Sequence, residues 1–557
     1  MEENNLAKFD GNQIQKVTDA IAITDKILGK ETSISNEAEK LYAEADAKYD
    51  LKEYDSAIEL LTKAVSIAPD FARAFNLRGL AKRKLKQYSS ALEDFVEAAR
   101  LDSKYANAFY NRGNTKDDLD DYNAAIEDFT IAIGLNQNDS SYYFGRGYSQ
   151  KNLKNYSAAI EDFTTAISLN PNDEKSYMNR GLSYKKLKQN KEAMDDYNKA
   201  ILIDEEYANA YYYRGFLKDD LKDYHGAIED YNKAISLNPD DDDYFRLRGV
   251  SKENLKDYDG ALADYCQAIV VNPKYSRAYY LRGKLKYYRL NDDSGAMDDY
   301  TKAIELDSDD ADFYYERGLV KHNLNDYNGA IQDFDKSLEL DDSEYFHFNS
   351  RGLSKHEIGD FHGAIKDFDK AIELDDYWEE FYYHRGLSKR EVEDYYGAIE
   401  DFTIAIGKDE KPIYYFCRGY AKETLKDYEG AVEDYTEAID LDPSDDALYN
   451  IRGLTKTTSK DYEGALEDFD SCIELNPNES SYYHNRGHAK MLMADYKGAI
   501  IDYSKAIDLD PTSAISFFER GLIKYDFNDK SGACKDWSIS GELGNMRAYD
   551  LMKQYCG

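Results

Sequence analysis

Apolar and small residues recur along this chain at helical spacing, in pairs of short segments. The stretch 211–221 shows apolar residues on one side of a helical pattern, which predicts a first helix. A second helix is predicted by the same spacing over 227–235, and the pair Asp223–Tyr224 punctuates the chain between them. The local pattern therefore predicts two short helices joined by a turn.

This two-helix unit recurs with a period of 34 residues. With Gly79 numbered as repeat position 8, residues 38–71 form a degenerate first unit, and the chain contains fifteen units. Prolines cluster at position 32, just past the second helix, where proline stops helices. The period predicts a solenoid of stacked units. The dipeptide Arg-Gly recurs with this period, and its arginines are Arg78, Arg112, Arg146, Arg180, Arg214, Arg248, Arg282, Arg317, Arg351, Arg385, Arg418, Arg452, Arg486 and Arg520.

The unit resembles the tetratricopeptide repeat. The resemblance covers roughly residues 38–547, and the Asp-Tyr-x-Gly-Ala-Ile-x-Asp-Tyr units look like those of bacterial members. It implies an all-α fold, a right-handed α-α superhelical solenoid of about fifteen 34-residue helix-turn-helix repeats. Gly at position 8 is expected to face Ala at 20 and allow close helix packing. One copy carries the matching positions 4, 8, 20, 24, 27 and 32 as Tyr211, Gly215, Ala227, Tyr231, Ala234 and Pro239.

The two ends differ from the repeats. Residues 1–36 read as a tail followed by an amphipathic helix over 13–28, and 37–545 comprise the fifteen repeats. The final segment, 546–557, predicts one further helix. Solenoid ends need capping, so we expect both end helices to be caps.

An arginine at position 7 and an aspartate at position 23 occur together in fourteen units. The first unit has neither and shows Glu44 and Leu60 instead. We therefore predict an ion pair between the two helices of one repeat, since pairing with the preceding repeat would set Arg78 against Leu60. A phosphate-binding track of arginines is the less favoured alternative. Lysine at position 11 is replaced by Gln150 and Tyr184 in two units that keep the pair, so we do not expect it to take part.

Composition narrows the classes of function. The 557 residues carry a net charge of −38, which argues against nucleic acid and anionic membranes as partners. No apolar run approaches the roughly 18 residues of a membrane span, and the acidic start lacks the features of a signal peptide. Together with the cysteines, these features predict a cytoplasmic protein. The five cysteines show no paired spacing, which fits a reducing compartment: Cys266, Cys417, Cys472, Cys534 and Cys556.

Motifs for catalysis, cofactors or metals are absent from the sequence, so we predict no enzyme activity, no cofactor and no metal site. His484 and His488 have the spacing of metal ligands, but no third ligand is evident nearby. Acidic loops at 239–243 and 307–312 invite a calcium interpretation. They lie where the next helix begins, and helix capping explains them better.

The resemblance places partner binding on the concave face, at first-helix positions 2, 5, 6, 9, 12 and 13. These positions sum to a charge of +4 in repeats 2–8 and −7 in repeats 9–15, so most acidic charge lies elsewhere. The first half is rich in tyrosine and asparagine, which suit peptide recognition. The candidate partner-binding residues are Tyr110, Asn111, Asn114, Phe144, Tyr148, Lys175, Asn179, Asn209, Tyr212, Tyr213, Phe216, Arg277, Tyr280, Tyr287 and Tyr288.

Tyrosines of the first helices can also serve to pack neighbouring helices. Position 4 tyrosines are expected to pack between helices, whereas those at position 5 fit packing and binding equally well. The lysine and asparagine set with which chaperone-tail receptors hold a C-terminal carboxylate is incomplete here. Asn114 and Asn179 match it, but Tyr110 and Gly145 stand at other required positions.

The sequence thus predicts a non-enzymatic scaffold that binds a partner protein or extended peptide in the concave groove. The alternative is a structural subunit that contacts a larger assembly through its ends and convex face. A nucleic-acid or phosphate binder using the basic, aromatic first half is disfavoured by the net charge. The identity of the partner and the oligomeric state stay open.

Overall fold

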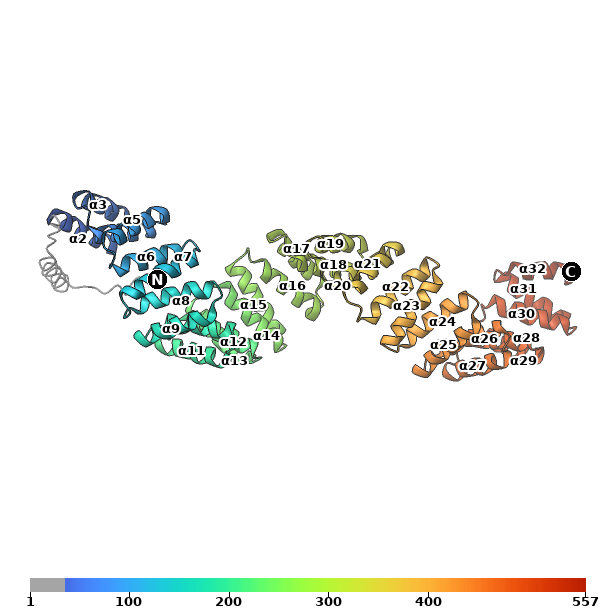
Figure 1. Ribbon diagram of the computed structural model, residues 1–557. Coiled ribbons are helices and arrows are strands. Elements are labelled where there is room, and N and C mark those ends of the chain that lie inside the picture. The colour runs from blue at the N-terminus through green and yellow to red at the C-terminus, as the bar shows by residue number, and fades with distance from the viewer. Residues whose placement is uncertain (1–35, 557) are drawn as a thin grey trace. The chain divides into compact units, whose positions relative to one another are not determined.

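The computed structural model describes residues 36–556, which form 31 α-helices and no β-strand (Figure 1). Consecutive helices pack in pairs, and each pair spans one unit of the sequence period, so the all-α repeat solenoid is confirmed. The described residues fall into two compact units, the first ending at Pro273 and the second beginning at Lys274. The tail and the amphipathic helix expected before residue 36 lie outside the described residues.

Unit 1 contains repeats 1–7. Its first helices are α2 (Asn36–Asp50), α4 (Ala72–Lys84), α6 (Ala106–Asp117), α8 (Ser140–Asn152), α10 (Glu174–Lys186), α12 (Ala208–Asp220) and α14 (Asp242–Asn254). Its second helices are α3 (Tyr54–Ile67), α5 (Tyr88–Leu101), α7 (Tyr122–Leu135), α9 (Tyr156–Leu169), α11 (Asn190–Ile203), α13 (Tyr224–Leu237) and α15 (Tyr258–Val271).

Unit 2 contains repeats 8–15 and one last helix, α32 (Met546–Tyr555). Its first helices are α16 (Ser276–Leu290), α18 (Ala311–Asn323), α20 (Tyr345–Glu357), α22 (Glu379–Glu391), α24 (Pro412–Thr424), α26 (Asp446–Ser459), α28 (Ser480–Leu492) and α30 (Ala514–Asp526). Its second helices are α17 (Asp293–Leu306), α19 (Tyr327–Leu340), α21 (Phe361–Leu374), α23 (Tyr395–Lys408), α25 (Tyr428–Leu441), α27 (Tyr462–Leu475), α29 (Tyr496–Leu509) and α31 (Lys530–Glu542).

Repeats 2–15 are each built around an aromatic ring at position 24 of the second helix, and Leu61 takes this place in the first repeat. Tyr231 is fully buried, as are the alanines at positions 20 and 27. Gly215, at position 8, lies directly against this ring, and a Cβ there would stand 3.0 Å from Tyr231 Cε1. The expected neighbour of this glycine was the alanine at position 20. The ring is closer because it reaches across the helix interface further than a methyl group does.

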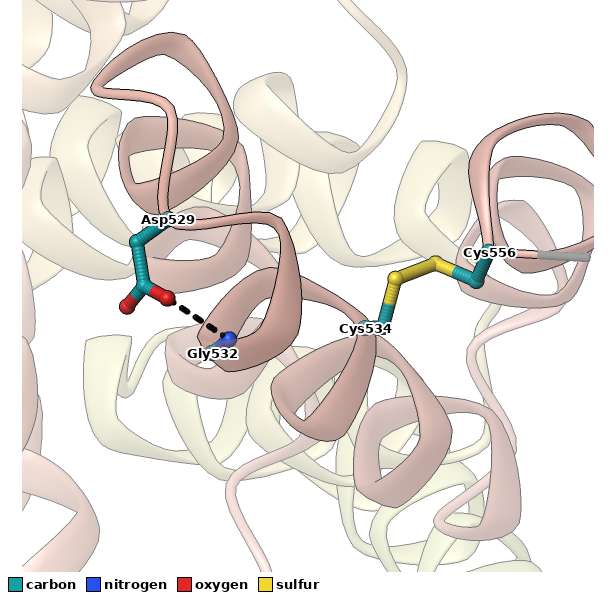
Figure 2. Close-up of a disulfide and its surroundings, with 4 residues drawn as sticks. All are labelled: Asp529, Gly532, Cys534 and Cys556. Atoms are coloured by element: carbon teal, nitrogen blue, oxygen red, sulfur yellow. Dashed lines mark hydrogen bonds between the residues drawn. A yellow bond between two sulfur atoms is a disulfide. The ribbon is translucent and has the colours of Figure 1, made fainter.

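Aspartate at position 16 begins the second helix. Asp223 Oδ1 accepts a hydrogen bond from the Gly226 amide at 3.1 Å, and Asp529 and Gly532 repeat the arrangement at 2.9 Å (Figure 2). A Cβ on either glycine would collide with the capping carboxylate. The glycine of the Asp-Tyr-x-Gly sequence therefore belongs to the helix cap, which satisfies an amide that has no partner within the helix.

The predicted ion pair within each repeat is confirmed in all fourteen repeats that carry it, from Arg78–Asp94 to Arg520–Asp536. In repeat 6, Arg214 Nη2 lies 2.6 Å from Asp230 Oδ1 and Nε lies 2.9 Å from Oδ2. Such a two-point contact between a guanidinium and a carboxylate is directional as well as strong. Because Asp230 is only 3% exposed, its charge needs this partner.

Lysine at position 11 also contacts the aspartate, so its expected exclusion from the pair is wrong. In the twelve repeats that have both this lysine and the aspartate, the lysine Nζ lies 2.7–2.9 Å from the aspartate Oδ2, as for Lys218 and Asp230. The reason is that a carboxylate has about four lone-pair sites, and the two-point contact with the guanidinium fills only two of them. In repeat 5, where Tyr184 replaces the lysine, burial raises the pKa of Asp196.

In most repeats the arginine further links its repeat to the one before it. Arg214 Nη1 donates to Asn198 Oδ1 at 2.7 Å, and Asn198 lies at position 25 of the preceding repeat. Thr164 takes the same place for Arg180, and Asp335 for Arg351. One guanidinium thus contacts two successive second helices, which ties the helix pairing within a repeat to the stacking of repeats.

A disulfide joins Cys534 on α31 to Cys556, the residue after α32 (Figure 2). The expectation that the cysteines are unpaired is therefore wrong for these two, because α32 packs back against α31 and brings distant positions together. Disulfides persist mainly in oxidising compartments, so the cysteines no longer support a cytoplasmic location, which stays a prediction. None of the helices within residues 36–556 has both the length and the apolar character needed to cross a bilayer.

We predict that Arg180→Met destabilises its repeat more than Arg214→Met does. Loss of Arg180 leaves the buried Asp196 without a cationic partner and is expected to cost about 3–5 kcal/mol. Asp230 keeps Lys218 after loss of Arg214, so about 1.5–3 kcal/mol is expected there. Local unfolding free energies from hydrogen exchange of α10–α11 and α12–α13 measure both. Equal losses at the two sites would show that the lysine contributes no stabilisation.

We predict that reduction of the Cys534–Cys556 disulfide loosens α32. The bond closes a segment of 22 residues, and its loss is expected to cost about 3 kcal/mol of chain entropy. Trp537, which is buried against Tyr525 and near Tyr555, reports the change through a red-shifted fluorescence. A Cys534→Ser/Cys556→Ser variant is the control and should be insensitive to dithiothreitol. Unchanged exchange rates in α32 on reduction would contradict the prediction.

Candidate functional site

The first helices line the inner side of each unit. The first helices of successive repeats approach one another closely. Helices α4 and α6 are an example in unit 1, and α16 and α18 are one in unit 2. Between residues 36 and 556, successive second helices form no comparably close pair. A stack whose first helices are closer together curves toward them. We call the surface formed by first-helix positions 2, 5, 6, 9, 12 and 13 the first-helix face.

The fifteen candidate residues all lie on first helices, eleven in unit 1 and four in unit 2. Their accessibility differs. Asn209, Arg277 and Tyr288 are exposed, whereas Asn111, Asn179 and Tyr280 are buried. The half-buried members are Tyr110, Asn114, Phe144, Tyr148, Lys175, Tyr212, Tyr213, Phe216 and Tyr287.

Burial favours a packing role for part of this set. Asn111 Nδ2 donates to Asn76 Oδ1 at 2.9 Å, a link between neighbouring first helices. Tyr280 is 4% exposed, with its ring 5.0 Å from that of Phe313. At position 4, Tyr211 is buried and the Arg214 guanidinium stands 5.5 Å from its ring centre. The expected packing of this position 4 tyrosine is therefore confirmed.

Cations stand over aromatic rings on the first-helix face of unit 1. Lys151 Nζ lies 4.2 Å from the ring centre of Tyr148, and Lys185 Nζ lies 3.5 Å from that of Phe216. Phe144 and Tyr148 are stacked at 6.3 Å between ring centres. Cation–π contacts hold long side chains against the surface without removing their charge. This part of the face therefore combines flat apolar area with positive charge.

Position 12 also decides whether the buried ring at position 24 has a polar partner. The Tyr231 hydroxyl donates to Asp219 Oδ2 at 2.9 Å, and Tyr265 donates to Glu253 at 3.0 Å. Tyr197 has Lys185 at position 12 instead of an acid, and its buried hydroxyl has no hydrogen-bond partner in the described part of the chain. Burial raises the pKa of both Tyr197 and Tyr231.

In unit 2 the structure reveals residues that sequence reasoning missed. Glu316, at position 6, is 6% exposed and accepts a hydrogen bond from the Tyr288 hydroxyl at 2.9 Å, with Lys284 Nζ at 3.3 Å. Further along, a surface depression of about 360 Å³ is lined by Arg390, Glu391, Tyr395, Phe416 and Tyr420. The repeat positions could have identified two of these residues in the sequence. Arg390 and Tyr420 occupy positions 12 and 9, the same positions as Lys185 and Phe216.

Three histidines of the first helices, His322, His356 and His484, hydrogen-bond to serines of the following repeat. His322 Nδ1 lies 2.9 Å from Ser354 Oγ, and His484 Nδ1 lies 3.0 Å from Ser516 Oγ. Burial lowers the pKa of His484 to about 4, so its imidazole is neutral at pH 7. These contacts give the histidines a structural role between repeats.

The acidic loops cap helices, as predicted. Asp241 accepts a hydrogen bond from the Asp243 amide at 3.2 Å, and Asp310 accepts one from the Asp312 amide at 3.0 Å. Within residues 36–556, Asp241, Asp242 and Asp243 are the one carboxylate group compact enough to surround a cation. Their position at the start of α14 explains the cluster through capping and the helix dipole.

Family models for the tetratricopeptide repeat match most of the chain. The matched residues are 42–106, 106–139, 140–173, 174–207, 208–241, 311–344, 412–445, 447–479 and 480–513, and a model described as TPR repeat matches 285–325. No curated protein matches the chain.

Several solved structures are similar to this chain. The Cut9–Hcn1 heterotetramer of APC/C is 16% identical over 87% of this chain and 96% of its own, with a TM-score of 0.35. A tetratricopeptide repeat protein from Parabacteroides merdae is 21% identical over 45% of this chain and 98% of its own, at 0.37. YrrB, described as a TPR protein with an unusual peptide-binding site, is 23% identical over 32% and 92%, at 0.29.

We predict opposite responses to removal of two buried hydroxyls. Tyr197→Phe should leave stability unchanged or raise it, because it removes a buried polar group without a partner. Tyr231→Phe should destabilise by about 1.5–3 kcal/mol, because it removes a hydrogen bond to a carboxylate. Urea unfolding with hydrogen exchange of α10–α13 measures both. An equal loss at Tyr197 would show that its hydroxyl is satisfied in solution.

Proposed function

The chain belongs to the tetratricopeptide-repeat family of protein-interaction scaffolds, and we propose that it binds an extended segment of a partner protein on the first-helix face of unit 1. The observation that carries this proposal is a group of partly accessible aromatic rings on the first-helix face of unit 1. Tyr148, Tyr213 and Phe216 on first helices are half-buried, whereas the second-helix rings of Tyr197 and Tyr231 are fully buried. Accessible tyrosine and phenylalanine rings typically anchor protein interfaces.

The polar groups of this face support recognition of an extended segment. Asn114 and Asn209 stand at positions 9 and 2 of the same face, and a side-chain amide can both donate to and accept from a peptide main chain. Tyr212 and Tyr213 contact each other edge to face at 4.8 Å between ring centres. Rigid, paired rings lose little conformational entropy on binding, which favours affinity for a partner.

A non-enzymatic role is part of the proposal. Burial raises the pKa of Cys417 to about 11 and of Cys472 to about 12, which disfavours the thiolate that nucleophilic catalysis needs. The first-helix histidines that hydrogen-bond to serines, such as His322 and His484, are engaged between repeats. These groups hold the fold together and offer no paired acid and base for a reaction.

A second candidate function is that of a subunit docked into a larger assembly through α32. The observation that favours it is the accessible apolar surface of this helix, where Met546 is 73% exposed and Tyr549 and Tyr555 are also exposed. Apolar surface of this kind marks interaction sites when it is contiguous. The two candidates predict different binding surfaces and can be separated by mutation.

The test is affinity capture from native lysate with the full chain and a Tyr148→Ala/Tyr213→Ala/Phe216→Ala variant. We expect the variant to fold and to lose the partner retained by the wild type, because the three rings supply the apolar contact area. The matched control is Leu202→Ala/Val270→Ala, which removes two exposed side chains from second helices and should keep the partner.

Two outcomes would contradict the proposal. Retention of the partner by the triple variant, with loss on a Met546→Ser/Tyr549→Ser variant, would favour docking through α32. Recovery of nucleic acid with an affinity that falls steeply with salt would instead indicate a phosphate-binding surface.

A further inference from the structure

Lys151, at position 12 of α8, is a partly buried cation without a counter-ion. Its Nζ lies 2.8 Å from Asn179 Oδ1 on α10 and 4.2 Å from the Tyr148 ring centre. No carboxylate of residues 36–556 comes within 4.0 Å of this amine. An amide oxygen and an aromatic ring stabilise an ammonium group only in part, so the charge is poorly compensated for its depth.

The other basic residues at position 12 each have a carboxylate partner. Arg83 Nε lies 2.6 Å from Asp118 Oδ2, and Lys185 Nζ lies 2.8 Å from Asp220 Oδ2. For Arg83 and Lys185 the aspartate stands at position 13 of the following repeat, 35 residues further along the chain. Arg390, the remaining arginine at position 12, pairs instead with its neighbour Glu391 at 2.7 Å. The same step from Lys151 leads to a second cation, Lys186. The register position that holds the carboxylate for Arg83 and Lys185 is therefore taken by a lysine here.

The surroundings of Lys151 are consistent with a missing anion. Burial lowers the pKa of Lys151 to about 8, and the attraction of Asp117 on α6 offsets this only in part. Asp117 is itself engaged, because it accepts a hydrogen bond from Ser149 Oγ at 2.6 Å. On α10, Lys175 and Lys186 add positive charge on the same side. A bound carboxylate would restore the compensation that the neighbouring repeats supply internally.

We propose that Lys151 and Lys186, with Asn179 and the Tyr148 ring, form a subsite for an aspartate or glutamate side chain of the partner segment. The proposal rests on the function proposed for this face and specifies what one part of the segment must carry. A carboxylate fits this place because Asp118 and Asp220 occupy the equivalent position in repeats 3 and 6. The subsite would bind a side-chain carboxylate. It therefore differs from the lysine and asparagine set of chaperone-tail receptors, which binds a C-terminal carboxylate and is incomplete in this chain.

The test compares two blocked decapeptides that differ at one residue, with a central glutamate or glutamine between aromatic residues. We expect the glutamate peptide to bind the full chain about tenfold more tightly than the glutamine peptide in fluorescence anisotropy, because a charge-assisted hydrogen bond is added. Lys151→Met should remove this preference. Lys186→Asp should remove it as well, because it places an internal carboxylate at this register position and leaves Lys151 intact.

Lys199→Met is the matched control, since it removes an equal charge from the exposed surface of α11 and should keep the tenfold preference. The preference should also decline as pH rises through about 8, because only the ammonium form of Lys151 attracts a carboxylate. Protection of Lys151 from acetylation by the glutamate peptide, read by mass spectrometry, gives a second measurement at the residue itself.

Equal binding of the two peptides, or a preference that survives Lys151→Met, would overturn the subsite. Tighter binding of a phosphoserine peptide than of the glutamate peptide, lost in Lys151→Met, would overturn the choice of a carboxylate. Neither result would bear on the wider function, which is tested separately by capture from lysate with the triple aromatic variant.

Discussion

A buried arginine–aspartate pair is the interaction on which the rest of this solenoid depends. A single helix pair cannot bury enough apolar surface to be stable alone. Each repeat therefore depends on the close pairing of its own two helices and on stacking against the neighbouring repeat. The guanidinium of Arg214 meets both needs, because it holds Asp230 with two nitrogens and Asn198 of the preceding repeat with the third. A misplaced helix would leave these charges buried and unpaired, which penalises wrong packing strongly.

Because the contacts that stabilise each repeat involve other positions, the residues of the first-helix face can vary between repeats. In repeats 2–15 the ring at position 24, the small residues beside it and the ion pair hold the two helices of the repeat together. Position 12, which lies between that core and the inner surface, can then be an acid such as Asp219, a cation such as Lys185, or a histidine such as His322. Each choice finds a different partner, so surface chemistry changes from repeat to repeat without a change of fold.

Net charge is a poor guide to what such a surface can bind. The chain carries −38, yet the first-helix face is close to neutral and contains cations at defined places. Local counter-ions decide whether a cation is available. Lys185 is paired with Asp220, whereas the same register from Lys151 ends on Lys186. A single residue at position 13, aspartate or lysine, thus decides whether the cation at position 12 forms an internal ion pair or is available to bind an external anion.

The repeat period alone was enough to predict the helix pairs, their number and the all-α solenoid. Periodicity reports which residues recur together, and recurrence also revealed the pairing of arginine with aspartate, since both are missing from the first repeat. The capping role of Asp241 followed from its place before a helix. These features are local or repeat in register, and such information is present in a linear sequence.

Other features were decided only by tertiary structure. The sequence could not show that Lys218 shares the carboxylate of Asp230, because the number of contacts an oxygen accepts is set by packing. It could not pair Cys534 with Cys556, which meet only because α32 folds back. It placed Tyr280 and Tyr288 in one candidate set, yet the first is buried and the second exposed. Depth depends on the side chains that neighbouring helices bring, and only the folded stack determines which of them meet.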